Sequence, residues 1–139
     1  MDGYRFVPLL GRILIGAPFL MSGLGKLGSY DRTTQMISAA GLAPAPLGWL
    51  IAVLIEAGGG VLLLIGFRAR WAALAMALFT VAAAVFFHRN FADQNQMIHF
   101  LKNVMLAGGL LQIFYFGPGP FSIDERGGRL RESSIPLGR

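Results

Sequence analysis

The sequence predicts an all-α protein, a transmembrane antiparallel four-helix bundle. Of its 139 residues 55% are apolar and only 14% are charged, whereas soluble domains average about 25% charged residues. Four apolar stretches, separated by Gly, Pro and charged residues, are each close to the roughly 20 residues that a helix needs to cross the hydrocarbon layer. Their apolar and polar residues do not alternate, so they are expected to be helices and not barrel strands.

The first two spans are expected to be joined by a long loop and the others by shorter ones. Arg12 interrupts the first span, which argues against a cleaved signal peptide. The long loop is expected to hold a short helix on the membrane surface, capped by Asp31, with Met36, Ile37 and Ala40 on one face. The predicted elements are spans at about residues 6–27, 47–66, 70–88 and 98–116, and a surface helix at about 32–40.

Residues 1–124 are expected to form the membrane domain, and residues 125–139 a basic, solvated cytoplasmic tail that also touches anionic lipid. Basic residues are unevenly distributed over the two predicted sides, seven against four, which predicts that both termini are cytoplasmic. The side with seven carries Arg5, Arg68, Arg70, Arg126, Arg129, Arg131 and Arg139. The other side carries Lys26, Arg32, Arg89 and Lys102.

Composition also limits the chemistry. The chain has no Cys, so disulfides and Cys-ligated zinc or iron–sulfur clusters are excluded. The net charge of +5 comes without an aromatic-interleaved basic patch, and no nucleic acid is expected to bind. His88, His99 and Glu56 match no metal-ligand spacing, so no metal site is predicted.

Two ionisable residues lie inside predicted spans, where a central charge costs about 2.5 to 3.5 kcal/mol. Glu56 is near the middle of the second span, and Arg12 is about 9 Å into the first. In antiparallel neighbours their heights differ by about 6 Å, which an Arg side chain can cover. We therefore expect a buried Arg12–Glu56 ion pair. The alternatives are that Arg12 reaches the surface while Glu56 is protonated, or that the pair only fixes helix register.

Helical spacing places further residues beside Arg12. Residues at intervals of four, three, four and three form one stripe of the first helix, which is expected to face protein. Glycines on this stripe allow another backbone to approach closely. Pro18, next to Ala17, is expected to interrupt or kink the helix. The stripe consists of Arg12, Gly16, Phe19, Gly23 and Lys26.

Polar residues also gather in the predicted non-cytoplasmic half. Together with Arg12 and Glu56, which are expected deeper in the membrane, these polar residues are expected to line a polar intramembrane cavity that binds a small amphiphile such as a quinone. Glu56 and His88 are predicted to move protons, while Arg12, Ser22, Lys26 and Asn103 are predicted to bind the ligand. Each end residue can also be an interfacial anchor.

The chain resembles the DoxX family of small four-helix membrane proteins from Leu9 to Asp124. The resemblance lies in LLGRILIGAPFLMSGLGKL, GLAPAP, IEAGGGVLLLIGFRAR, AVFFH, FLKNVMLAGGLL and GPGPFSID, in that order. It implies an inner-membrane protein that is linked in some relatives to quinone-dependent sulfur oxidation or to oxidative-stress complexes with soluble partners. It also implies functional positions at Arg12, Ser22, Lys26, Glu56, His88 and Asn103.

Three functions follow as hypotheses. The first is a membrane component of a quinone-linked oxidoreductase or oxidative-stress complex, with no intrinsic cofactor and a soluble or membrane redox partner. The second is a non-enzymatic scaffold or assembly factor. The third and weakest is a small-solute carrier, because no inverted repeat is visible. The ligand, the partner and any homo-oligomer stay open.

Overall fold

Four helical segments are long and apolar enough to cross a membrane. The structure, a computed structural model, describes the backbone of residues 2–133 and the side chains of residues 3–130. Within that part all regular structure is helical, and the predicted all-α bundle is confirmed. The four segments are Gly3–Leu27, Ala45–Ile65, Ala69–Phe87 and Gln94–Phe116.

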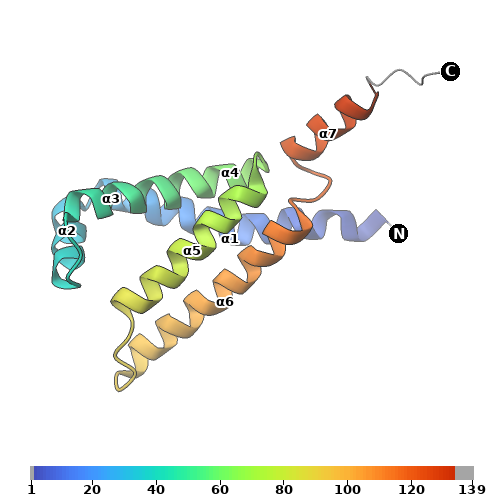
Figure 1. The fold of residues 1–139 in the computed structure, drawn as a ribbon. Helices are drawn as coiled ribbons and strands as arrows, with labels where there is room; N and C mark the ends of the chain where they lie inside the picture. The colour runs from blue at the N-terminus through green and yellow to red at the C-terminus, as the bar shows by residue number, and fades with distance from the viewer. Residues whose placement is uncertain (1, 134–139) are drawn as a thin grey trace.

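The spans are arranged as two antiparallel hairpins (Figure 1). In the first, α1 (Val7–Leu27) lies along α3 (Ala45–Val53), the π-helical turn η2 (Leu54–Gly58) and α4 (Gly59–Ile65), which continue one another. In the second, α5 (Ala69–Phe87) lies along α6 (Gln94–Phe116). The first hairpin is closed by α2 (Tyr30–Ala39), and α5 begins directly after the tight turn that ends α4.

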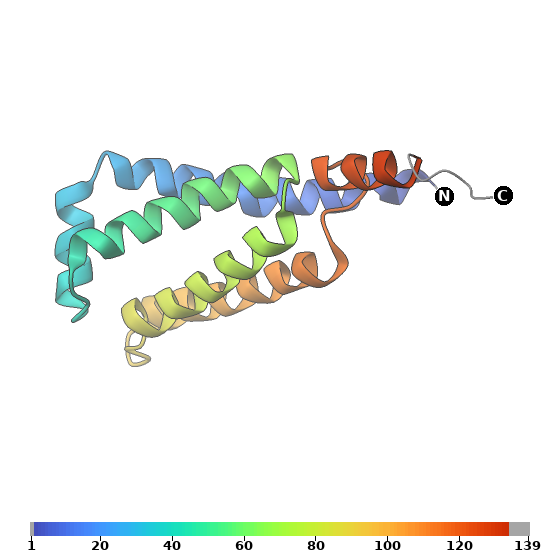
Figure 2. The same cartoon turned by 45° about the horizontal axis from the view of Figure 1, so that its top comes forward.

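The two ends of the bundle are built differently (Figure 2). One end carries α2 and the loop between α5 and α6. The other carries the short 3-10 helix η1 (Asp2–Phe6), the α4–α5 turn and α7 (Ile123–Ser133). We call the second of these the terminal end, because both described ends of the chain lie there. The predicted tail boundary at residue 125 falls inside α7, and residues 134–139 lie outside the described part.

The first hairpin is held by backbone contact at small residues. A Cβ on Gly23 would lie 2.4 Å from the backbone nitrogen of Ala57, and a Cβ on Gly60 would lie 2.8 Å from the carbonyl oxygen of Gly16. The buried residues of α1 are Arg12, Gly16, Phe19 and Gly23. The predicted protein-facing stripe is therefore confirmed for these four residues.

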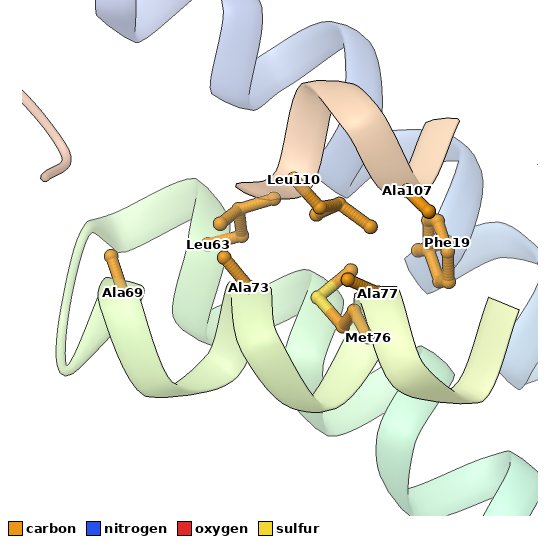
Figure 3. Close-up of a cluster of buried hydrophobic side chains, with 8 residues drawn as sticks. All are labelled: Phe19, Leu63, Ala69, Ala73, Met76, Ala77, Ala107 and Leu110. Atoms are coloured by element: carbon orange, nitrogen blue, oxygen red, sulfur yellow. The ribbon is translucent and has the colours of Figure 1, made fainter. Parts of the chain in front are cut away.

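A cluster of buried apolar side chains joins the two hairpins (Figure 3). Most of its members are small, which lets the helices approach closely. The side chain of Met76 fills the space above Gly59, where a Cβ would lie 2.8 Å from the Met76 Cγ. The cluster consists of Phe19, Leu63, Ala69, Ala73, Met76, Ala77, Ala107 and Leu110.

Three local expectations are corrected. Asp31 does not cap α2, because the helix begins at Tyr30 after Ser29. Met36 does not share the buried face of Ile37: it is 52% exposed, whereas Ile37 is 5% exposed and packs over Gly48. Pro18 lies inside α1 without interrupting it.

Candidate functional site

Glu56 lies in the π-helical turn η2, in the middle of the second span. π-Helical turns inside α-helices are rare and frequently occur at functional sites. Of the three glycines at positions 58–60, Gly60 packs against the backbone of Leu20 in α1, whereas Gly59 packs against Met76 in α5. The Glu56 residue is only 8% exposed, so its carboxylate is held between helices and does not face lipid.

The Glu56 carboxylate meets two side chains of α1. Its Oε2 atom lies 2.7 Å from Nζ of Lys26 and accepts a hydrogen bond of 3.0 Å from Oγ of Ser22. Lys26 Nζ also donates to Ser22 Oγ over 3.1 Å, and the four-residue spacing puts the two on one helix face. We call these three residues the Glu56 cluster. It combines a carboxylate, an ammonium group and a hydroxyl between two neighbouring membrane spans.

The lysine end of the cluster is fixed by aromatic residues. The Nε1 atom of Trp49 donates to the carbonyl oxygen of Lys26 over 2.9 Å. The Tyr30 ring packs edge-on against Trp49, with ring centroids 5.0 Å apart. These contacts tie α3 and α2 to the last turn of α1 and hold the Lys26 backbone in place. The Lys26 side chain stays 22% exposed, so a ligand can reach it.

Arg12 does not pair with Glu56, which corrects the predicted ion pair. It is fully buried, and its Nη1 donates to the carbonyl oxygens of Leu63 at 2.9 Å and Leu64 at 3.2 Å. Its Nη2 donates to the carbonyl oxygen of Phe121. The last carbonyls of a helix lack partners within the helix and carry partial negative charge, which suits a guanidinium. Arg12 therefore joins α1, the end of α4 and the segment after α6.

The register of the first hairpin explains why the prediction failed. Arg12 lies opposite Leu63, seven residues beyond Glu56, which corresponds to about 10 Å along a helix. This distance exceeds the expected value of about 6 Å because the two spans do not begin and end at the same height. Gly23 lies against Ala57, the neighbour of Glu56, and the Lys26 side chain, one helical turn beyond Gly23 on the same stripe, reaches the Glu56 carboxylate instead.

His88 and Asn103 belong to the second hairpin. His88 ends α5, and its ring stacks on that of His99 with centroids 5.1 Å apart. Burial lowers the pKa of the His88 imidazole below 6.5, and the nearby His99 lowers it further. Among the side chains that the structure describes, none hydrogen-bonds His88 or Asn103 to the Glu56 cluster. Three of the six predicted site residues therefore come together, namely Ser22, Lys26 and Glu56.

No metal centre is formed within the described residues, since they contain no group of three or more His, Asp and Glu side chains able to hold an ion.

The terminal end holds contacts that the sequence did not reveal. The Asp124 carboxylate accepts hydrogen bonds from the backbone nitrogens of Arg68 at 2.7 Å and Ala69 at 2.9 Å, and so caps the start of α5. The backbone nitrogen of Asp124 donates to the carbonyl oxygen of Gly66 over 3.0 Å. A capping residue 55 positions away from its helix has no local sequence signature, since ordinary caps precede the helix directly.

Comparison with known proteins gives one family and two relatives. The sequence profile of the DoxX family matches residues 7–89. The inner membrane protein YqjF of Escherichia coli K12 is 40% identical over 117 residues, 84% of this chain and 88% of the relative. The inner membrane protein YphA of the same organism is 35% identical over 124 residues, 85% and 88% of the two chains. No solved structure matches the chain.

Proposed function

The chain is an integral inner-membrane protein of the DoxX family, and from this premise we propose that it is the membrane component of a quinone-linked oxidoreductase. The Glu56 cluster would bind the polar head of the quinone, while the apolar part stays in lipid. The observation that carries the proposal is the 2.7 Å contact between Lys26 and Glu56 inside a span. Intramembrane ionisable residues are costly and generally mark ligand or proton pathways.

The donor set of the cluster suits a quinone. An ammonium group has three N–H donors, and Lys26 directs its donors to Glu56 and Ser22. One donor is left for a ligand carbonyl oxygen. Ser22 is exposed on α1, and its hydroxyl supplies a second donor once it turns from Glu56. A bound quinone would supply two-electron chemistry, and the electrons must come from a partner because this chain has no thiol.

The proton path is assigned to this chain's own groups. Glu56 would accept a proton from the ligand, because its carboxylate is the acceptor group of the cluster and lies beside Ser22 and Lys26. His88 would exchange protons with water at the loop end of the bundle, where its lowered pKa favours the neutral imidazole. Arg12 takes no part in this path; its three carbonyl contacts give it a structural role. Asn103, at the four-residue helix spacing from His99, is assigned to orienting the ligand.

The test is retention of quinone by the full chain purified in mild detergent. Wild-type protein should carry extractable quinone, whereas Glu56→Gln and Lys26→Met should each lower its affinity at least about tenfold, which corresponds to about 1.4 kcal/mol. The matched control is Lys102→Met, because Lys102 is an exposed lysine of a spanning helix. Equal retention by all four proteins would rule out the cluster as the binding site.

A scaffold or assembly factor is the second candidate, and the docking of the terminal end favours it. Arg12 and Asp124 fix the start of α7, so a helix with three arginines is held in one place for a partner. Truncation after Asp124 should then abolish partner pull-down while the bundle keeps its stability. Unchanged pull-down would count against this function.

We also propose that both termini are cytoplasmic. The presence of η1 and α7 at one end of the bundle agrees with four crossings (Figure 1), and the excess of arginines at that end gives the direction. Alkaline phosphatase fused after Arg139 should be inactive. Strong activity would reverse the orientation.

A further inference from the structure

A hollow lies at the terminal end where η1 meets α7. Its volume is about 410 Å³, and we call it the arginine hollow. It brings together residues from both ends of the described chain. The lining consists of Arg5, Pro120, Phe121, Arg126, Arg129 and Leu130.

The described side chains that line the arginine hollow carry charge of one sign. Three guanidinium groups line it, and no carboxylate does so among the side chains that the structure describes. Guanidinium groups bind phosphate through paired hydrogen bonds, which makes Arg the preferred residue for phosphate recognition. A neighbouring hollow of about 460 Å³ differs: Asp124 and Glu125 line it together with Arg68 and Arg70. Of these two hollows, the arginine hollow has the charge that an anion requires.

Phe121, which lines the hollow, is held by contacts with η1 and α1. Its ring stacks on Phe6 with centroids 4.6 Å apart, and its carbonyl oxygen accepts a hydrogen bond from buried Arg12. The guanidinium of Arg5 lies 5.8 Å from the centroid of the same ring. Phe121 is therefore anchored to η1 and α1 before any ligand binds.

The hollow opens at the boundary of the membrane. Arg5 is in η1, and this 3-10 helix leads directly into the first span, Gly3–Leu27. Next to Arg5, the side chains of Phe6, Val7 and Leu10 are more than half exposed and form an apolar strip that starts beside the hollow. A soluble anion makes no contact with an apolar strip, whereas the acyl chains of a lipid would cover it.

We propose that the arginine hollow binds the head group of an anionic phospholipid, with the acyl chains lying along the first turns of α1. The phosphate lies among the three arginines, and the Phe121 ring lies between the phosphate and the buried core. Clusters of basic residues next to membrane spans bind anionic head groups, with about 1 kcal/mol contributed by each Lys or Arg. Lipid binding would thereby hold α7 against η1.

The experiment titrates the full chain in neutral detergent with three probes: dihexanoyl phosphatidylglycerol, dihexanoyl phosphatidylcholine and inorganic phosphate. Binding is followed by the thermal unfolding midpoint and by native mass spectrometry. Phosphatidylglycerol should bind and raise the midpoint, phosphatidylcholine should not, and phosphate should compete only weakly. Arg126→Gln/Arg129→Gln should weaken phosphatidylglycerol binding roughly 30-fold, which corresponds to about 2 kcal/mol.

The matched control removes two arginines from the neighbouring hollow, Arg68→Gln/Arg70→Gln, and should keep the wild-type affinity. If both double variants lost the same affinity for phosphatidylglycerol, general surface charge would explain the binding and the proposed site would be overturned. Equal binding of the two lipids, or competition by inorganic phosphate at the same concentration as lipid, would overturn the lipid assignment. If the first double variant does not fold, Arg129→Gln alone should weaken binding about fivefold, and unchanged affinity would be equally decisive.

Discussion

Lys26 Nζ and Glu56 Oε2 are 2.7 Å apart across the interface between α1 and the π-helical turn η2. Lys26 is the last basic residue of its span, and Glu56 is near the middle of the next. The pair therefore connects the membrane-embedded part of one helix to the surface end of its neighbour. Ser22 completes the contact by hydrogen bonding to both partners.

This relationship predicts strong coupling between the two residues. Either single substitution, Lys26→Met or Glu56→Gln, removes one partner of a largely buried pair and should lower the free energy of unfolding by about 3 kcal/mol. The double variant should be less destabilised than the sum of the two, with a coupling energy of about 1–3 kcal/mol. Unfolding in detergent followed by circular dichroism measures all four proteins. Strict additivity would show that the contact contributes nothing.

The close approach of α1 and η2 predicts opposite outcomes at two nearby glycines. Gly23→Ala places a methyl group 2.4 Å from the backbone nitrogen of Ala57, so the helices must separate, at about 1–3 kcal/mol. Gly25→Ala meets nothing within 4 Å, and should stay within about 1 kcal/mol of wild type, because Ala favours a helix over Gly. Thermal unfolding of the two variants compares them directly; similar midpoints would argue against the tight interface.

The hydrogen bonds of Arg12 link the bundle core to the segment after α6. Arg12→Met should release the carbonyl oxygen of Phe121, and with it the segment that leads to α7. Hydrogen bonds to a charged group contribute about 1.5–3 kcal/mol each, so we expect at least about 3 kcal/mol of destabilisation. Hydrogen exchange should rise over residues 117–124. Arg32→Met, on the exposed surface of α2, is the control and should leave exchange in that segment unchanged.

The lowered pKa of His88 predicts how the stability of the protein changes with pH. Its pKa is lowered from 6.5 in the folded protein, so the unfolded chain takes up a proton first as the pH falls through 6.5. Stability should therefore decrease on acidification from pH 7 to pH 5. His88→Gln should flatten this dependence of the unfolding midpoint. His99→Gln should flatten it less, because burial is the larger cause of the shift; an unaltered pH profile for His88→Gln would contradict the assignment.

Much of the architecture was readable from local sequence properties. Hydropathy over about 20 residues identifies a span wherever it occurs, and the 3.6-residue period assigned Arg12, Gly16, Phe19 and Gly23 to one face. Both are properties of a single helix in lipid. The surface helix was predicted as well, but its first residue was misplaced, since Ser29 and Asp31 both have side chains that suit a cap.

The tertiary structure alone decided which polar groups meet. The partner of Glu56 depends on how far α1 slides along α3, η2 and α4, and the contacts of Gly16 with Gly60 and of Gly23 with Ala57 set that register. The ends of a span can be placed in a sequence only to within several residues, and an error of one helical turn, about 5 Å, is enough to bring Glu56 out of reach of Arg12. The capping of α5 by Asp124 joins positions more than fifty residues apart, and such a contact exists only after the two hairpins have packed.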